Sequence, residues 1–221
     1  DASGGVQGNP RAGDHGVHRI SRAAGGVAGE ERRLVRARGF AGVFGLAAAR
    51  RWLAEGSGPT FLWLHLYEPH FPYAPPEPFA SRFGGNPSAG EIAFADAQVG
   101  RLLAAIEARW PDGATLVVIT SDHGESRGEH GEDTHGYTIY AATQHVPLLL
   151  RGPGLPAGAT IGSLVRLADV APSVVEMLGA PALPGAQGSS LRPLVRGEHD
   201  APRTAYLETL ATHFDWRWSP L

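Results

Sequence analysis

The sequence changes most abruptly from apolar to polar residues in the middle of the chain. Residues 115–120 form a mostly apolar run rich in β-branched side chains, which predicts a strand buried on both faces. Residues 121–136, which follow directly, are all polar or glycine and include three histidines. Because open α/β sheets bind ligands beyond the carboxyl ends of their strands, this polar loop is a candidate functional site.

Strand and helix patterns alternate along the rest of the chain. Helices are predicted to end near residue 54 and to span 88–109 and 169–178; the second begins with a capping-box pattern and has an apolar stripe starting at Ile92. Strands are predicted over residues 60–66, 115–120, 146–151, 161–167 and 204–208. This alternation predicts an α/β fold with a mostly parallel sheet covered by helices, in which the first three strands are neighbours.

The first 46 residues show neither a strand nor a helix period. Residues 1–45 hold eleven of the thirty glycines, and residues 1–59 carry nine arginines against five acidic residues. Three interpretations are open: a flexible tail, a poorly patterned part of the fold, and a stretch translated out of frame. We favour a non-native or truncated segment, because strong patterning begins only near Ala47.

Composition excludes several classes of function. The 221 residues contain no cysteine, so disulfides and cysteine–zinc sites are excluded, while the cellular compartment is left undetermined. All 19 basic residues are arginine, and the net charge of −3 argues against a nucleic-acid partner. No run of about 18 apolar residues is present, so this chain encodes no membrane span.

Asp122 and His123 are the first strong metal-ligand types in the polar loop. Carboxylate oxygens and imidazole nitrogens are common ligands of divalent metal ions, so this pair is the predicted metal site. An ordinary polar surface loop is the competing interpretation. Three histidines directly after one predicted strand make that interpretation the weaker of the two.

Four segments together resemble the sulfatase family of the alkaline-phosphatase superfamily. They are Phe61–Tyr73, Gly90–Arg101, Ser121–Glu125 and Val146–Gly154, and they follow the family's order within about residues 47–218. The resemblance implies a three-layer α/β/α sandwich with a mostly parallel sheet, here truncated, in which residues 47–221 are part of a catalytic domain. It also implies a metal-dependent hydrolase that acts on a small-molecule or glycan sulfate ester.

The resemblance assigns roles to three residues. Asp122 and His123 match the family's metal-binding pair; one divalent ion is implied, with calcium as the first candidate and manganese and zinc as alternatives. His70 matches the histidine of a Pro-His-x-Pro loop that helps the leaving group depart, and an imidazole can donate a proton near neutral pH. Judged by residue type alone, His70 would instead pack among the aromatic side chains next to it.

His135 departs from the family pattern. Many sulfatases carry a lysine thirteen positions after the metal-binding aspartate, where it holds a sulfate oxygen, but this chain carries His135 there. Phosphoethanolamine transferases of the same superfamily place a histidine at that point, so His135 resembles their phosphate-binding or second-metal histidine. We count it as a catalytic residue, and a phosphodiesterase or phosphoethanolamine transferase stays open as an alternative function.

The nucleophile segment of the family has no counterpart in residues 1–59. In the family it is a Cys/Ser-x-Pro-x-Arg segment or a threonine equivalent, and neither occurs there. Because nucleophile and metal act on the same atom, a chain without the nucleophile is expected to show little turnover. We therefore expect part of a catalytic domain, and an inactive, non-catalytic fragment is the third open function.

Overall fold

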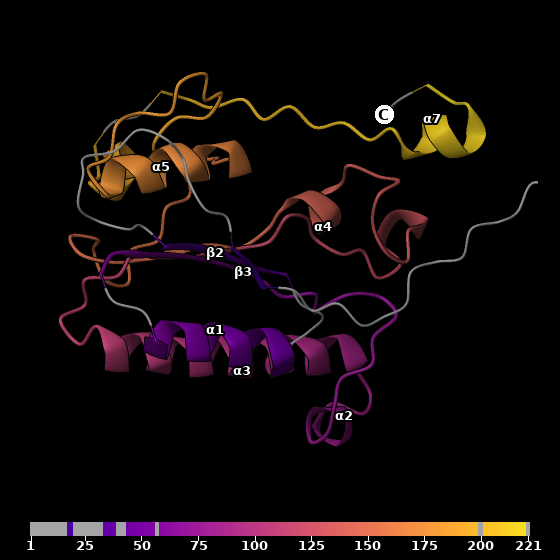
Figure 1. Ribbon diagram of the computed structural model, residues 1–221. Coiled ribbons are helices and arrows are strands. Elements are labelled where there is room, and N and C mark those ends of the chain that lie inside the picture. Colours follow the sequence, from indigo (N-terminus) through magenta and orange to yellow (C-terminus); the bar gives the residue numbers. More distant parts are fainter. Residues whose placement is uncertain (1–16, 20–32, 39–42, 56–57, 199–200, 220–221) are drawn as a thin grey trace, which may run out of the picture. The chain divides into compact units, whose positions relative to one another are not determined.

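The computed structural model describes residues 17–19, 33–38, 43–55, 58–198 and 201–219 of the chain. Contacts between residues divide the chain into two compact units, residues 1–109 and residues 110–221. Both units contain strands and helices, which are numbered in chain order; Figure 1 labels several of them. The expected domain boundary between residues 46 and 47 stays a prediction.

The first unit is built on a strand–helix–strand crossover. β2 (Arg33–Arg38) and β3 (Thr60–His65) pair in parallel, and α1 (Val43–Glu55) connects them. Parallel neighbours need such a crossover, because the chain must return to the end of the sheet at which the first strand began. β1 (Val17–Arg19) pairs antiparallel with β2. The predicted helix end near residue 54 and the strand predicted over 60–66 are both present.

β1 and β2 lie in a segment whose pattern predicted no element. β2 is six residues long and half of them are arginine, so its own periodicity is too weak to identify a strand. Backbone pairing with β3 accounts for it instead. The expectations for residues 1–16, 20–32 and 39–42 lie outside the described residues.

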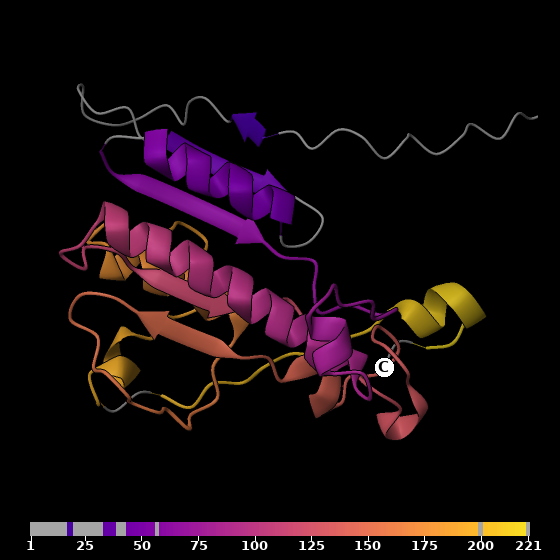
Figure 2. The same cartoon turned by 90° about the horizontal axis from the view of Figure 1, so that it is seen from below.

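Among the side chains that the structure describes, two helices supply the buried apolar ones of the first unit. Leu46, Ala49 and Leu53 recur on one face of α1 and are buried. Figures 1 and 2 show α1 running along β2 and β3 and beside α3 (Pro87–Arg109), which contributes Phe94. Phe79 of the short helix α2 (Phe79–Arg82) packs edge-on against Phe94 at 5.6 Å between ring centroids.

The helix predicted over 88–109 is present, but its predicted apolar stripe is wrong at its start, whereas Val99, Leu103 and Ile106 further along are partly buried. Ile92 is exposed, whereas Glu91, Phe94 and Gln98 are buried. The capping-box expectation also fails, because the Asn86 side chain accepts the Ala89 backbone N–H at 3.1 Å and the Glu91 carboxylate is bound to a different segment. A buried carboxylate with partners from elsewhere in the chain has no signature in local periodicity.

The second unit contains a two-stranded sheet. β4 (Val117–Thr120) and β5 (Leu148–Arg151) are neighbours as predicted, but they run antiparallel, not parallel. The physical reason is the segment between them, which holds only the single-turn elements η1 (Glu129–Gly131) and α4 (Ala141–Gln144) and no crossover helix. β4 is also only partly buried, so its predicted burial on both faces is not found. Whether β3 neighbours this sheet stays a prediction.

Helical turns form the remainder of the second unit. The predicted helix over 169–178 is confirmed as α5 (Val170–Met177), preceded by η2 (Leu167–Asp169), and Gly179 follows it with a φ of 65°. Two further helices follow, α6 (Arg192–Val195) and α7 (Ala211–Trp216). The strands predicted over 161–167 and 204–208 are not formed.

A buried carboxylate holds these turns together. Asp169 is fully buried; its carboxylate accepts Arg166 at 2.8 Å and the backbone N–H of Ser189 at 2.8 Å, and pairs with Arg203 at 3.3 Å. Desolvation alone would raise the pKa of Asp169, but these donors hold it below its ordinary value. Within the described part of the chain, no helix is long and apolar enough to cross a membrane.

Candidate metal-binding and catalytic site

The Asp122–His123 pair lies in a tight turn directly after β4. Thr120 donates its hydroxyl to the Pro147 carbonyl at 2.9 Å, and the Gly124 N–H donates to the Thr143 carbonyl at 2.8 Å, so the turn is fastened at both ends. A Cβ atom on Gly124 would lie 2.1 Å from the Ala142 carbonyl oxygen. Only glycine therefore fits after the pair without displacing backbone.

The two side chains of the pair present donors that one ion could share. The Gly124 carbonyl can only accept, so the His123 Nδ1 that contacts it at 2.9 Å carries the proton, and Nε2 carries the lone pair. Nε2 lies 3.8 Å from the Asp122 Oδ1. Two ligand bonds of about 2.0–2.4 Å span that separation, so the donor types and their spacing fit a divalent ion. The Asp122 carboxylate is exposed.

A complete coordination sphere is not formed by these residues alone. Among the described residues, no group of three or more histidine, aspartate or glutamate side chains is close enough together to hold a metal ion. Divalent sites usually take four or more ligands, so Asp122 and His123 could supply only part of one.

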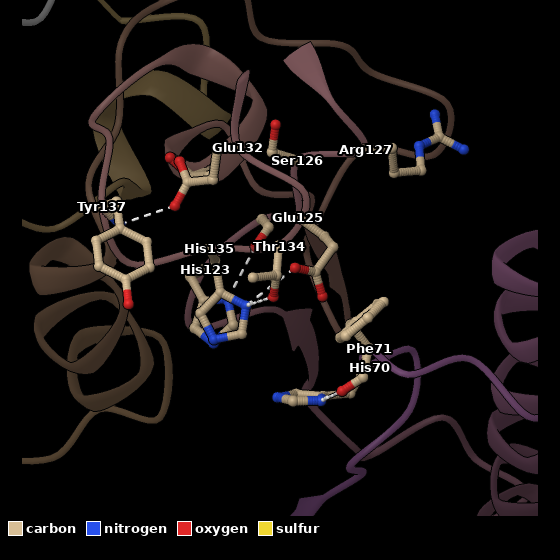
Figure 3. A network of polar contacts seen from close by, with 12 residues as sticks. His70, Phe71, His123, Glu125, Ser126, Arg127, Glu132, Thr134, His135 and Tyr137 are labelled. Atoms are coloured by element: carbon tan, nitrogen blue, oxygen red, sulfur yellow. Dashed lines mark hydrogen bonds and ion pairs between the residues drawn. The ribbon is translucent and has the colours of Figure 1, made fainter. Parts of the chain in front are cut away.

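His135 lies beside His123. Their rings stack at 3.9 Å between centroids with 30° between planes. His135 Nδ1 contacts the Glu125 carboxylate at 3.0 Å and the Thr134 hydroxyl at 3.2 Å (Figure 3). Because an ionised carboxylate only accepts, Nδ1 donates to Glu125, and Nε2 is the nitrogen through which His135 could contact a ligand.

The loop that carries His135 is fixed by buried side chains. Glu132 is buried and accepts the backbone N–H groups of Tyr137 at 2.7 Å and Thr138 at 3.1 Å, and also the Thr138 hydroxyl. Glu129 accepts the N–H of Arg127 at 2.5 Å, and this bond is the main cause of its lowered pKa. These carboxylates shape the loop that carries His135.

His70 belongs to the first unit and lies in the proline-rich loop after β3. Its ring stacks on Tyr67 at 4.4 Å, and its Nδ1 donates to the Phe71 carbonyl at 2.5 Å, which leaves Nε2 as the functional nitrogen. Both the aromatic packing and the leaving-group role foreseen for it are compatible with this geometry. The roles that the family resemblance implies would require His70 to lie near Asp122, His123 and His135; His70 is in the first unit and the other three are in the second, so this stays a prediction.

Glu91 is the residue of this region that sequence reasoning missed. Its buried carboxylate accepts the backbone N–H of His70 at 2.9 Å and that of Ala74 at 2.7 Å, and so ties the His70 loop to α3. The pKa of Glu68 in this loop is raised, first by burial and further by the negative charge of Glu91. The only signal was a carboxylate in the first turn of the predicted helix, and it pointed to a cap.

Comparison with known proteins identifies the class to which this fold and loop belong. The family model named Sulfatase matches residues 46–180, more than half of the chain, and the chain therefore belongs to the sulfatase family. It is 36% identical over 99 residues to human (Homo sapiens) arylsulfatase K, a match that covers 45% of this chain and 18% of that protein. With zebrafish (Danio rerio) arylsulfatase K the identity is 35% over 100 residues, a match that covers 45% of this chain and 19% of that protein.

The fold is shared with a solved enzyme of the same architecture. The phosphonate monoester hydrolase of Agrobacterium radiobacter superposes with a TM-score of 0.64 at 23% identity, covering 72% of this chain and 43% of that one. The α/β, alkaline-phosphatase-like fold class expected from the sequence is thereby confirmed. The aligned stretches span less than half the length of each of these proteins. Sulfatases generally use a divalent metal ion.

Proposed function

We propose that this chain is part of a metal-dependent hydrolase of sulfate esters, acting on a small-molecule or glycan sulfate ester. Membership of the sulfatase family and similarity to arylsulfatase K support the reaction class. The observation that carries the proposal is the Asp122–His123 pair, in which the Gly124 carbonyl fixes the proton on His123 Nδ1 and leaves Nε2 as a ligand atom beside a carboxylate.

The residues have separate roles in this proposal. Asp122 and His123 hold the ion, whose charge would polarise the ester oxygens. His135, oriented by Glu125, contacts an oxygen of the bound group through Nε2. His70, oriented by the Phe71 carbonyl, gives a proton to the departing alcohol from Nε2.

Calcium is the first candidate for the ion, with manganese and zinc as alternatives. The Asp122 carboxylate suits all three, whereas the imidazole of His123 is a softer ligand that favours manganese or zinc over calcium. The donor pair thus leaves the choice of metal to experiment.

The nucleophile is not among the motifs of this chain. With no cysteine in 221 residues, a cysteine-derived nucleophile would have to come from sequence outside them. The isolated chain should therefore bind metal without turning over aryl sulfates. Steady turnover that His123→Ala abolishes would contradict this expectation and reveal a nucleophile within the chain. A chain that neither binds metal nor turns over would favour the non-catalytic alternative.

His135 supports a second candidate, a phosphodiesterase or phosphoethanolamine transferase. A permanently charged lysine is replaced by an imidazole that pairs with Glu125, and this exchange changes how an anion would be held. Competition between inorganic sulfate and inorganic phosphate for the metal-loaded chain separates the two candidates. Sulfate should bind more tightly if the first is right, and phosphate if the second is right.

The direct test of the metal site is calorimetric titration of the chain with calcium, manganese and zinc. His123→Ala removes a ligand and should weaken binding of the preferred ion at least about ten-fold. His145→Ala is the matched control, because His145 is an exposed histidine elsewhere in the same unit. Unchanged affinity in His123→Ala, or an equal loss in His145→Ala, would refute the assignment.

A further inference from the structure

Three aromatic rings gather on the surface next to the His135 loop. Tyr137 stacks on Trp216 at 5.2 Å between centroids with 29° between planes, and Trp216 contacts Trp218 at 5.4 Å. The three side chains are 37%, 51% and 63% exposed, respectively. This aromatic ladder, Tyr137–Trp216–Trp218, has no role in the site described above. Exposed rings of this size in one place mark a binding surface more often than a scattered apolar residue does.

The ladder is fixed in place by the backbone around it. α7 ends at Trp216, and the next residue, Arg217, has a left-handed conformation with φ of 59°, so the chain turns back and brings Trp218 beside Trp216. Two bonds hold this turn: Trp218 N–H donates to the Thr212 carbonyl at 3.2 Å, and His213 Nδ1 donates to the Trp218 carbonyl at 3.0 Å. Rings held in this way lose little freedom when a ligand binds.

The ladder is continuous with the candidate site. Tyr137 is two residues after His135 on the same loop, and its backbone N–H is bound by Glu132 (Figure 3). Thr209 donates its hydroxyl to the Gly136 carbonyl, and the Tyr137 hydroxyl donates to Asp215 of α7. The organic part of an ester whose oxyanion contacts His135 would therefore lie near these rings.

The polar groups beside the ladder restrict which kind of ligand can bind there. The hydrogen bond to Asp215 and its charge raise the pKa of the Tyr137 hydroxyl, with a smaller contribution from Glu132. Arg217 stands between Trp216 and Trp218 in the sequence, but the Tyr137 end of the ladder is bordered by negative charge. A polyanionic ligand would be repelled there, and a plain aryl group would desolvate Asp215 without a hydrogen bond. A neutral pyranose suits both features, because its C–H face stacks on rings while its hydroxyls donate to a carboxylate.

We propose that the Tyr137–Trp216–Trp218 ladder is the subsite for the alcohol part of the substrate, and that it takes a pyranose ring without further anionic substituents beside the ladder. The inference rests on the proposed ester-hydrolase function for its place in the reaction. It makes Tyr137, Trp216 and Asp215 determinants of substrate specificity.

The test uses nitrogen-15-labelled 221-residue chain and follows the indole N–H resonances of Trp216 and Trp218. The probes are methyl β-glucopyranoside, phenyl sulfate and inorganic sulfate, each titrated into the millimolar range. Methyl β-glucopyranoside should shift both resonances. Loss of one stacked ring in Trp216→Ala should weaken its binding about three- to ten-fold. Trp218→Ala should give a similar loss and serves if Trp216→Ala does not fold.

Phe214→Ala is the matched control, because Phe214 lies on the same helix, is 72% exposed and is outside the ladder. It should leave glycoside binding unchanged. Four results overturn the proposal: no shift with the glycoside, shifts with phenyl sulfate alone, equal loss in Phe214→Ala, or resonances that move with protein concentration, which would mean a second copy covers the ladder. The neutral glycoside needs neither metal nor sulfate, so failure of the metal site leaves this result interpretable.

Discussion

The carboxylate of Glu91 should be the main support of the His70 loop. Glu91→Ala would leave the backbone N–H groups of His70 and Ala74 without the acceptor they contact at 2.9 and 2.7 Å. Each hydrogen bond to a charged acceptor is worth about 1.5–3 kcal/mol, and both end on one carboxylate, so their sum is an upper bound. We expect the free energy of unfolding to fall by about 3 kcal/mol.

Urea unfolding followed by circular dichroism measures this change. A loss of about 3 kcal/mol corresponds to a decrease of about 1 M or more in the midpoint for typical slopes. Glu91→Gln should be milder, because one oxygen still accepts while the amide NH₂ faces the second N–H. Asp96→Ala is the matched control, since it removes an exposed carboxylate from the same helix. It should change stability by less than about 0.5 kcal/mol.

Hydrogen exchange distinguishes loss of this support from a general loss of stability. In Glu91→Ala the amides of His70 and Ala74 should exchange faster by more than the fall in global stability explains. If Glu91→Ala is as stable as Asp96→Ala and those two amides keep their protection, the carboxylate does not hold the loop and the reasoning fails.

Three further outcomes are expected. Asp169→Asn leaves two guanidinium groups facing a neutral amide and should cost about 3–5 kcal/mol in urea unfolding, whereas Glu176→Gln, at an exposed pair, should cost under about 1 kcal/mol. Because the folded pKa of Asp169 lies below its ordinary value of 3.8, its stabilisation is present above that pH and is lost as pH falls further; Asp169→Asn should flatten this acid limb of the stability profile. Gly124→Ala, whose Cβ would meet the Ala142 carbonyl, should weaken metal binding and lower the free energy of unfolding by about 1–3 kcal/mol. Gly100→Ala in α3, where space is open, should instead raise the free energy of unfolding by about 0.5–1 kcal/mol.

The sequence predicted those features that a single segment determines. The apolar run before Asp122 produced β4, the patterns over 88–109 and 169–178 produced α3 and α5, and Gly179 ends the latter with positive φ. In each case the residues that determine the element are the residues within it. The turn after β4 follows the same rule, because His123 Nδ1 is bound by the carbonyl of the next residue.

Features that depend on distant partners were not predictable in this way. The direction of β5 depends on what lies between the strands, and a loop of single turns returned the chain antiparallel where a crossover helix had been assumed. Glu91 has the spacing of a cap, yet its partners lie 21 and 17 residues earlier. A glutamate at this helical position can cap its own helix or bind a distant loop, and only the fold determines which backbone N–H groups reach it.

The same reasoning explains why only part of the candidate site could be predicted from the sequence. The proposed metal-ligand pair, Asp122 and His123, is adjacent in the chain and is recognised by residue type. Its orientation depends on Gly124 fitting against the Ala142 backbone, 18 residues further on. The aromatic ladder shows the other extreme, because Tyr137 and Trp216 are joined only through the fold and neither residue stands out in its own segment. Residues that are contiguous in the sequence identify the reaction class, and we expect contacts between distant segments, such as Tyr137 with Trp216, to determine which substrate the site accepts.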